Sequence, residues 1–130
     1  MMDIKTMMSI ENVQISSAYI RVERGIFLTA GLFVDGDGWG QNFGGSLLVN
    51  KHHGFNEKSG WGLEYISRIM EIAGVEEWSD VKGCFIRIKR GAESEAIEAI
   101  GHIIKDDWFS PRELALKYGL GESGRNNDNA

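Results

Sequence analysis

The side chains best suited to binding chemistry lie in a glycine-rich segment, residues 35–45, which follows an apolar run. Between its glycines stand Trp39, Gln41 and Phe43, and a strand would place these three side chains on one face. Two rings beside the amides of Gln41 and Asn42 offer what a nucleobase needs, namely stacking surfaces and groups that read its edge. The same pattern is typical of a hairpin whose aromatic side chains belong to the core. Both interpretations follow from the sequence.

A second group of candidate residues is cationic and lies in a predicted strand at residues 83–89. Phe85, Arg87 and Lys89 alternate there with apolar residues, and Arg90 follows directly. One face of this strand therefore packs, while the other presents a ring and two cations. A guanidinium offers a planar fork that suits two phosphate oxygens. Alternating cations also occur on strands that simply face solvent, so this group is a candidate anion site rather than a specific motif.

Recognisable catalytic and metal-binding motifs are missing from the sequence. His52 and His53 are neighbours with no third ligand at metal spacing, which favours a surface loop over a metal site. His102 lies in an apolar stretch and is expected to be a partly buried imidazole, with a polar ligand contact as the alternative. The single cysteine, Cys84, lies in an apolar run, which predicts a buried thiol. We therefore expect no catalytic residue, metal or cofactor, and the candidate ligand-binding residues are Trp39, Gln41, Asn42, Phe43, Phe85, Arg87, Lys89, Arg90 and His102.

Composition narrows the classes of partner. The chain has 130 residues with a net charge of -5, from 14 basic and 19 acidic residues. Duplex nucleic acid is therefore not expected as a partner, because binding its phosphate backbone normally requires a broad basic surface. No apolar run reaches the roughly 18 to 20 residues of a membrane span, so we expect a cytoplasmic protein without membrane contact. Trp61, Trp78 and Trp108 are expected in the core or at an interface with a second copy.

Hydrophobic periodicity predicts an α+β fold, a small antiparallel sheet of about four to five strands packed with two or three helices. The Asp-Gly steps at residues 35–38 indicate a hairpin, and Ser110 followed by proline indicates a helix start. The expected strands span residues 13–23, 26–34, 39–49 and 83–89. The expected helical segments span residues 59–74, 75–81 and 110–118, the first of them with Leu63, Ile66, Met70 and Ala73 on its apolar face.

The pattern at residues 93–106 fits either an amphipathic helix or a return strand, and we favour a strand at about 97–104 because glycine interrupts the helical pattern. The predicted domain organisation is simple. A flexible N-terminus (1–9) precedes one ligand-binding domain (10–120), and a polar tail (121–130) is expected to be disordered.

A succession of motifs spans residues 10–118. In order they are Gly-Ile-Phe-Leu-Thr-Ala, Gly-Asp-Gly-Trp-Gly-Gln-Asn-Phe-Gly-Gly, Gly-Leu-Glu-Tyr-Ile, Val-Glu-Glu-Trp-Ser-Asp-Val-Lys-Gly-Cys-Phe-Ile-Arg-Ile-Lys-Arg and Ile-Gly-His-Ile-Ile-Lys-Asp-Asp-Trp-Phe. This succession, rather than any single motif, resembles the Thoeris anti-defence sponge proteins of the first described family, which are small proteins encoded by phages.

The resemblance implies a function that residue spacing alone does not. Proteins of that family bind a cyclic ADP-ribose isomer, the signal made by a bacterial immune TIR-domain enzyme, and sequester it without degrading it. The downstream effector then stays inactive in the infected bacterial host. Some members also hold cyclic oligonucleotide signals at a separate site, and members assemble as homodimers or larger symmetric oligomers. The candidate residues named above come from their chemistry and are not carried over from the family.

Two other classes of function remain open on the sequence. A protein-binding inhibitor of a host enzyme would suit the acidic balance of the chain. A hydrolase of a cyclic nucleotide would use His102 as acid or base. The first would lose nothing when Arg87 or Phe43 is replaced, and the second would release a new product.

Overall fold

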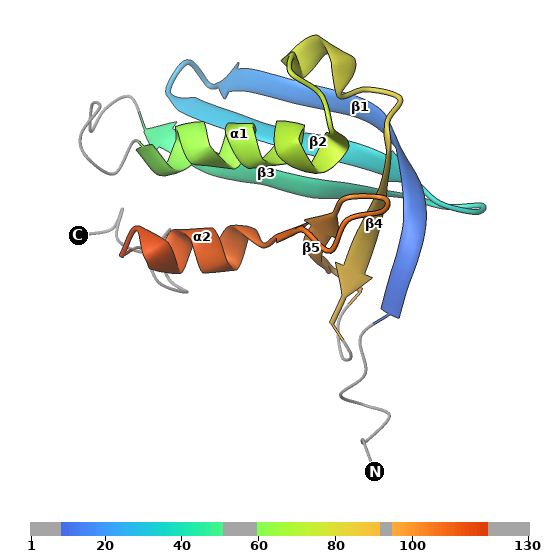
Figure 1. Ribbon diagram of the computed structural model, residues 1–130. Helices are drawn as coiled ribbons and strands as arrows, with labels where there is room; N and C mark the ends of the chain where they lie inside the picture. Colours follow the sequence, from blue (N-terminus) through green and yellow to red (C-terminus); the bar gives the residue numbers. More distant parts are fainter. Residues whose placement is uncertain (1–8, 51–59, 92–94, 120–130) are drawn as a thin grey trace.

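The computed structural model of the protein describes residues 9–50, 60–91 and 95–119. In these ranges a six-stranded antiparallel sheet carries two α-helices on one face (Figure 1), so the predicted α+β class is confirmed. The strand order is β3-β2-β1-β4-β5-β6. The elements are β1 (Ser9–Glu23), β2 (Phe27–Asp35), β3 (Gly40–Asn50), α1 (Gly60–Ala73), a 3₁₀ turn (Trp78–Asp80), β4 (Phe85–Arg90), β5 (Ile97–Gly101), β6 (Trp108–Phe109) and α2 (Pro111–Lys117).

Three predictions fall wholly or largely outside these ranges. They are the flexible N-terminus, of which only Ser9 is described and begins β1, the loop with His52 and His53, and the tail at 121–130. No helix among the described residues is long and apolar enough to cross a membrane.

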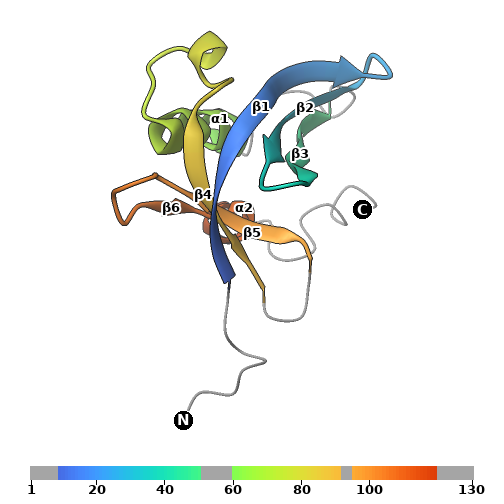
Figure 2. The ribbon, with the colours of Figure 1, turned by 90° about the vertical axis from the view of Figure 1, so that its right-hand side faces the viewer.

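β1 is long and bent, and it joins the two halves of the sheet (Figures 1 and 2). Its first part pairs with β4 and its second part with β2, and the register shifts between Ile15 and Ser17, where the two parts meet. A bulge of this kind increases the local bend and twist of a strand. As a result α1 contacts strands at both edges of the sheet, β3 and β6. The sheet therefore has an inner face toward the helices and an outer face that neither α1 nor α2 covers.

The core lies between the inner face and the helices. From α1 it takes Tyr65, Ile69 and Ile72, all buried, whereas Leu63 is 74% exposed. The predicted helix is therefore confirmed, but its predicted apolar face is wrong at Leu63. The helix carries two overlapping rows of apolar side chains, and the row that contains Tyr65 is the one that packs on the sheet. The Tyr65 ring centroid lies 5.3 Å from that of Phe109. The buried core residues are Val13, Ile15, Ala30, Leu32, Val34, Phe43, Tyr65, Ile69, Ile72, Val81, Ile86, Ile88, Ile100, Phe109 and Leu114.

The ambiguous segment forms a strand, as favoured from the sequence. β5 pairs with β4 on one side and with the two-residue β6 on the other, and residues 102–107 form the turn between β5 and β6. The predicted helix start is also confirmed, since Ser110 Oγ accepts a hydrogen bond from the Glu113 N–H (3.3 Å) and Pro111 occupies the first turn of α2. These elements place β4, β5 and β6 side by side at the end of the sheet where the candidate cations lie.

Candidate functional site

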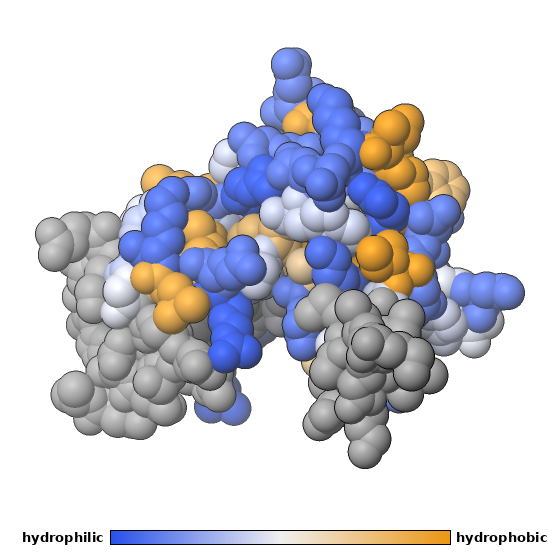
Figure 3. Space-filling model, turned by 60° about the horizontal axis from the view of Figure 1, so that its bottom comes forward, coloured by the Kyte–Doolittle hydropathy of each residue, from blue (hydrophilic) through white to orange (hydrophobic). Residues whose placement is uncertain are grey.

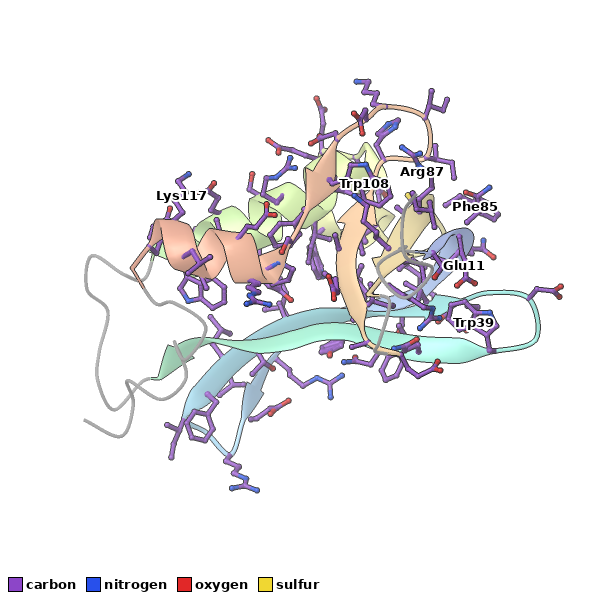
Figure 4. The ribbon with its side chains drawn as sticks, turned by 90° about the horizontal axis from the view of Figure 1, so that it is seen from below. Glu11, Trp39, Phe85, Arg87, Trp108 and Lys117 are labelled. Carbon is purple, nitrogen blue, oxygen red and sulfur yellow. The ribbon has the colours of Figure 1, made fainter. Side chains whose placement is uncertain are left out.

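The predicted site residues do not come together at one place. Phe85, Arg87 and Lys89 lie on the outer face of β4, because the residues that alternate with them, Ile86 and Ile88, are fully buried. Trp39 and Gln41 lie instead on the core side, where Trp39 packs against the buried core, and Arg90 reaches them from the end of β4. Figure 4 shows this separation, with Arg87 close to Trp108 and Trp39 nearer the β2–β3 hairpin.

The outer face carries a cluster of one indole and two cations, together with the nearby Phe85. The guanidinium carbon of Arg87 lies 4.9 Å from the ring centroid of Trp108, and Lys89 Nζ lies 4.1 Å from it. We call Phe85, Arg87, Lys89 and Trp108 the outer cluster. The register explains the contact, since Arg87 pairs with Gly101 across β4–β5 and Gly101 pairs with Trp108 across β5–β6.

Gly101 allows the indole to lie flat against the sheet. A Cβ atom at this position would stand 2.6 Å from the Trp108 ring, closer than real Cβ contacts. The glycine therefore acts through close approach and not through an unusual backbone angle. The indole Nε1–H donates to Asp106 Oδ1 (3.0 Å), which fixes the ring further.

Arg87 is oriented by backbone carbonyls. Its Nε donates to the His102 carbonyl and its Nη2 to the Lys105 carbonyl, both at 2.8 Å. Within the described part of the chain neither Arg87 nor Lys89 forms an ion pair. Carbonyl groups orient a guanidinium without cancelling its net charge, so the two cations beside Trp108 keep theirs. Phe85, two residues before Arg87, is 58% exposed on the same face.

The core side carries a second, different cluster. The Arg90 guanidinium carbon lies 4.6 Å from the Trp39 ring centroid, and Arg90 Nε pairs with Glu11 Oε2 at 3.0 Å. Its Nη1 donates to Gln41 Oε1 and to the Glu95 carbonyl. We call Glu11, Trp39, Gln41 and Arg90 the inner cluster. The Arg90 side chain is only 14% exposed and its charge is paired with Glu11, so this cluster joins β1, β3, β4 and the segment just before β5.

Phe43, Asn42 and His102 belong to neither cluster. Phe43 is 2% exposed and meets Phe109 edge to face at 6.4 Å, so its ring is part of the core and has no surface for a ligand. Asn42 lies on the outer face of β3, far along the sheet, where its Oδ1 accepts a hydrogen bond from the Tyr19 hydroxyl at 2.8 Å. Of the two interpretations of the glycine-rich segment, the hairpin with core aromatics is therefore the correct one for Phe43.

His102 holds the turn between β5 and β6. Its Nδ1 accepts hydrogen bonds from the N–H groups of Ile104 and Lys105, both at 3.0 Å, and its carbonyl receives Arg87. The imidazole is half-buried and lines a pocket of about 440 Å³, which also has Glu71, Gly74, Val75, Glu76, Lys105 and Asp107 in its wall. His102 thus supports the outer cluster through Arg87 without facing it.

The other candidate reactive groups of the described residues are a single thiol and the acidic side chains. Cys84 donates its S–H to the Asp80 carbonyl (3.2 Å), and burial raises the pKa of this thiol. No group of three or more histidine, cysteine or acidic side chains suited to a metal ion occurs in the ranges that the structure covers.

Trp108 is the functional candidate that the sequence did not indicate. The prediction placed it in the core or at an interface, whereas it forms the floor of the outer cluster. A two-residue strand has no periodicity of its own, so only the pairing of β6 with β5 reveals the contact. Comparison with known proteins adds no further information, because no protein-family model, curated protein or solved structure matches this chain.

Proposed function

We propose that this chain is a phage anti-defence protein that binds and sequesters a cyclic ADP-ribose-type signalling nucleotide without cleaving it. Acting in the cytoplasm of the infected host, it would keep the downstream bacterial effector inactive. The observation that carries the proposal is the outer cluster, in which the Trp108 ring stands beside two cations that have no carboxylate partner among the described residues. The motif succession described above supports the same ligand class.

The chemistry of the cluster complements such a ligand. A purine gains about 1–3 kcal/mol from stacking on an aromatic ring. Each charge-assisted hydrogen bond from Arg87 or Lys89 to a phosphate contributes about 1.5–3 kcal/mol. The exposed Phe85 ring offers a second apolar surface beside these groups.

The free energies of stacking and of the two charge-assisted hydrogen bonds also bear on the oligomeric state of the protein. Together they reach about 4–9 kcal/mol, whereas nanomolar binding requires about 12 kcal/mol. A single outer cluster therefore falls short of the affinity that sequestration needs. A second copy that covers the ligand would supply further contacts and exclude water, so the proposal includes a homodimer or larger symmetric oligomer.

The proposal includes no chemical step. Two groups suited to acid–base work lie beside the outer cluster. Asp106 accepts the Trp108 indole N–H at Oδ1, and His102 Nδ1 is occupied by two backbone N–H groups. General acid–base catalysis needs a side chain within hydrogen-bond reach of the reacting group. The role of His102 in this arrangement is to hold the turn that orients Arg87.

The test combines binding with recovery of the ligand. The protein is titrated with cyclic ADP-ribose by calorimetry, washed, denatured by heat, and the supernatant is analysed by mass spectrometry. We expect saturable binding and an intact cyclic nucleotide. Lys89→Ala should weaken binding, while Lys82→Ala, which removes an exposed lysine elsewhere, should not. Linear ADP-ribose in the supernatant would indicate a hydrolase, and the absence of binding would sink the proposal.

One observation favours a second candidate, a protein-binding inhibitor. Three large apolar side chains are exposed on the outer face, Ile10 at 54%, Phe33 at 46% and Phe85 at 58%. Exposed apolar surface of this kind is common at protein interfaces. On the side of the molecule that Figure 3 shows, however, the hydrophobic patches are small and separated by hydrophilic residues. This candidate predicts that Phe33→Ser abolishes inhibition of a host enzyme, whereas cyclic ADP-ribose binding would be absent in the unchanged protein.

A further inference from the structure

Arg68 of α1 reaches the turn that carries Trp108. Its Nη2 lies 2.7 Å from Asp107 Oδ1 and donates to the Trp108 carbonyl at 3.0 Å, while Nη1 contacts Glu71 and, at 3.4 Å, Asp107 Oδ2. The Arg68 side chain is 21% exposed. One guanidinium therefore fixes both a side chain and a backbone oxygen next to the outer cluster.

The same turn is held from the opposite side by Arg87. The Lys105 carbonyl accepts hydrogen bonds from Arg87 Nη2 (2.8 Å) and from the Asp107 N–H (2.9 Å), and the Asp107 carbonyl accepts one from the His102 N–H (3.0 Å). A continuous set of contacts thus runs from α1 through the turn to Arg87. Because β6 has only two residues, its pairing with β5 alone gives the Trp108 backbone little support.

We propose that Arg68 is a positioning residue for ligand binding at the outer cluster, although it does not belong to that cluster. By fixing Asp107 and the Trp108 carbonyl, it holds the indole flat on Gly101 and beside Arg87 and Lys89 before any ligand arrives. The inference rests on the proposed function. A site that is ordered in advance avoids the entropy cost of ordering its side chains during binding.

The contacts of Arg68 suit this role better than a general contribution to stability. Asp107 is 43% exposed, and ion pairs near the surface contribute little to the free energy of unfolding. The Arg68 guanidinium also lowers the pKa of the Asp107 carboxyl group, so the ion pair persists to lower pH than an unpaired carboxylate would allow. Losing the order of the Trp108 and Arg87 side chains should weaken ligand binding roughly tenfold.

The test uses Arg68→Lys, which keeps the charge but loses the planar fork that serves Asp107 and Trp108 together. Its first readout needs no ligand: the ¹⁵N relaxation of the indole N–H groups of Trp108 and Trp39. We expect the Trp108 indole to become mobile and the Trp39 indole to stay rigid. The second readout is the Kd for cyclic ADP-ribose, which should rise roughly tenfold.

Lys117→Gln is the matched control. Lys117 forms an ion pair with Glu64 of α1, at the end of the molecule far from Arg87 and Trp108 (Figure 4). This variant should change neither readout. A rigid Trp108 indole in Arg68→Lys would overturn the inference, and so would an unchanged Kd. If the unchanged protein does not bind cyclic ADP-ribose, the proposed function fails, and the relaxation readout then decides the positioning of Trp108 independently.

Discussion

The outer and inner clusters use the same residue types for opposite purposes. In each, a tryptophan lies over a glycine, Trp108 over Gly101 and Trp39 over Gly36, and an arginine stands beside the indole at 4.9 or 4.6 Å. The difference lies in the partners of the arginine. Arg90 is paired with Glu11 and largely buried, whereas Arg87 donates only to backbone carbonyls.

This difference indicates that the group bound to an arginine, more than the arginine itself, decides whether its side chain has a structural or a ligand-binding role. A carboxylate cancels the charge of Arg90, and the Arg90 Nη1 donates to the Gln41 amide oxygen and to the Glu95 carbonyl. Carbonyl partners leave the charge of Arg87 available to an anion. The comparison therefore predicts that equivalent substitutions in the two clusters have opposite effects, one on stability and one on affinity.

The largest expected effect is on stability, at Phe43, which follows Trp39 and Gln41 on the inner face of the sheet and is buried in the core. Phe43→Ala should lower the free energy of unfolding by about 3–5 kcal/mol, because it leaves a cavity among buried side chains. The affinity of the folded protein for cyclic ADP-ribose should not change. Urea denaturation measures the first quantity, and Phe33→Ala, at an exposed ring on the outer face, is the control with a small effect.

The next effect separates the two arginines. Arg87→Ala should weaken cyclic ADP-ribose binding roughly 10- to 100-fold through loss of a charge-assisted contact. Arg90→Ala should leave affinity unchanged but lower the free energy of unfolding by about 1–3 kcal/mol, because Glu11 and the Gln41 Oε1 atom lose their partner. Calorimetry and denaturation of both variants check this. An affinity loss in Arg90→Ala alone would reverse the assignment of the clusters.

A smaller effect is expected at the two glycines. Gly101→Ala places a Cβ atom 2.6 Å from the Trp108 ring and should displace the indole, which weakens ligand binding without any change of charge. Gly36→Ala displaces Trp39 in the same way and should affect only stability, with overpacking of this kind costing about 1–3 kcal/mol. Equal affinity losses in both variants would show that the two indoles are equivalent for the ligand.

The smallest expected effect concerns pH. Hydrogen bonding to Arg68 lowers the pKa of Asp107, so the stabilisation from its carboxylate is present above the ordinary pKa and is lost as the pH falls through the lowered one. Asp107→Asn should therefore flatten part of the loss of stability below about pH 4. The urea midpoint at neutral and acid pH measures this. Glu64→Gln serves as a comparison variant, because the Glu64 carboxyl group also has a lowered pKa. If the loss of stability with falling pH is the same in Asp107→Asn as in the unchanged protein, the Asp107 carboxylate does not contribute to it.

The sequence predicted features that depend on neighbours along the chain. The hairpin after β2, the cap at Ser110 and the alternation of cations with Ile86 and Ile88 each follow from local rules, and the structure confirms them. The strand at 97–101 was favoured for a similar reason, since Gly101 interrupts a helix. Local backbone preference and periodicity were sufficient for these elements.

The composition of the candidate site depends on pairings between distant segments, which periodicity does not specify. Gln41 and Arg90 matched a ligand site by residue type, yet they bind each other across 49 positions of the chain. Trp108 reaches Arg87 only because β5 places Gly101 between them. A sequence shows which side chains carry charge or rings, and the register of the sheet decides which of them already have partners.

Binding at the outer cluster is tested most directly by titrating ¹⁵N-labelled protein with cyclic ADP-ribose and following the indole N–H signals of Trp39 and Trp108. Each signal is assigned with the corresponding tryptophan-to-phenylalanine variant. We predict that the Trp108 signal shifts and saturates while the Trp39 signal stays in place. A shift confined to Trp39, or no shift of either signal at ligand excess, would contradict ligand binding at this surface.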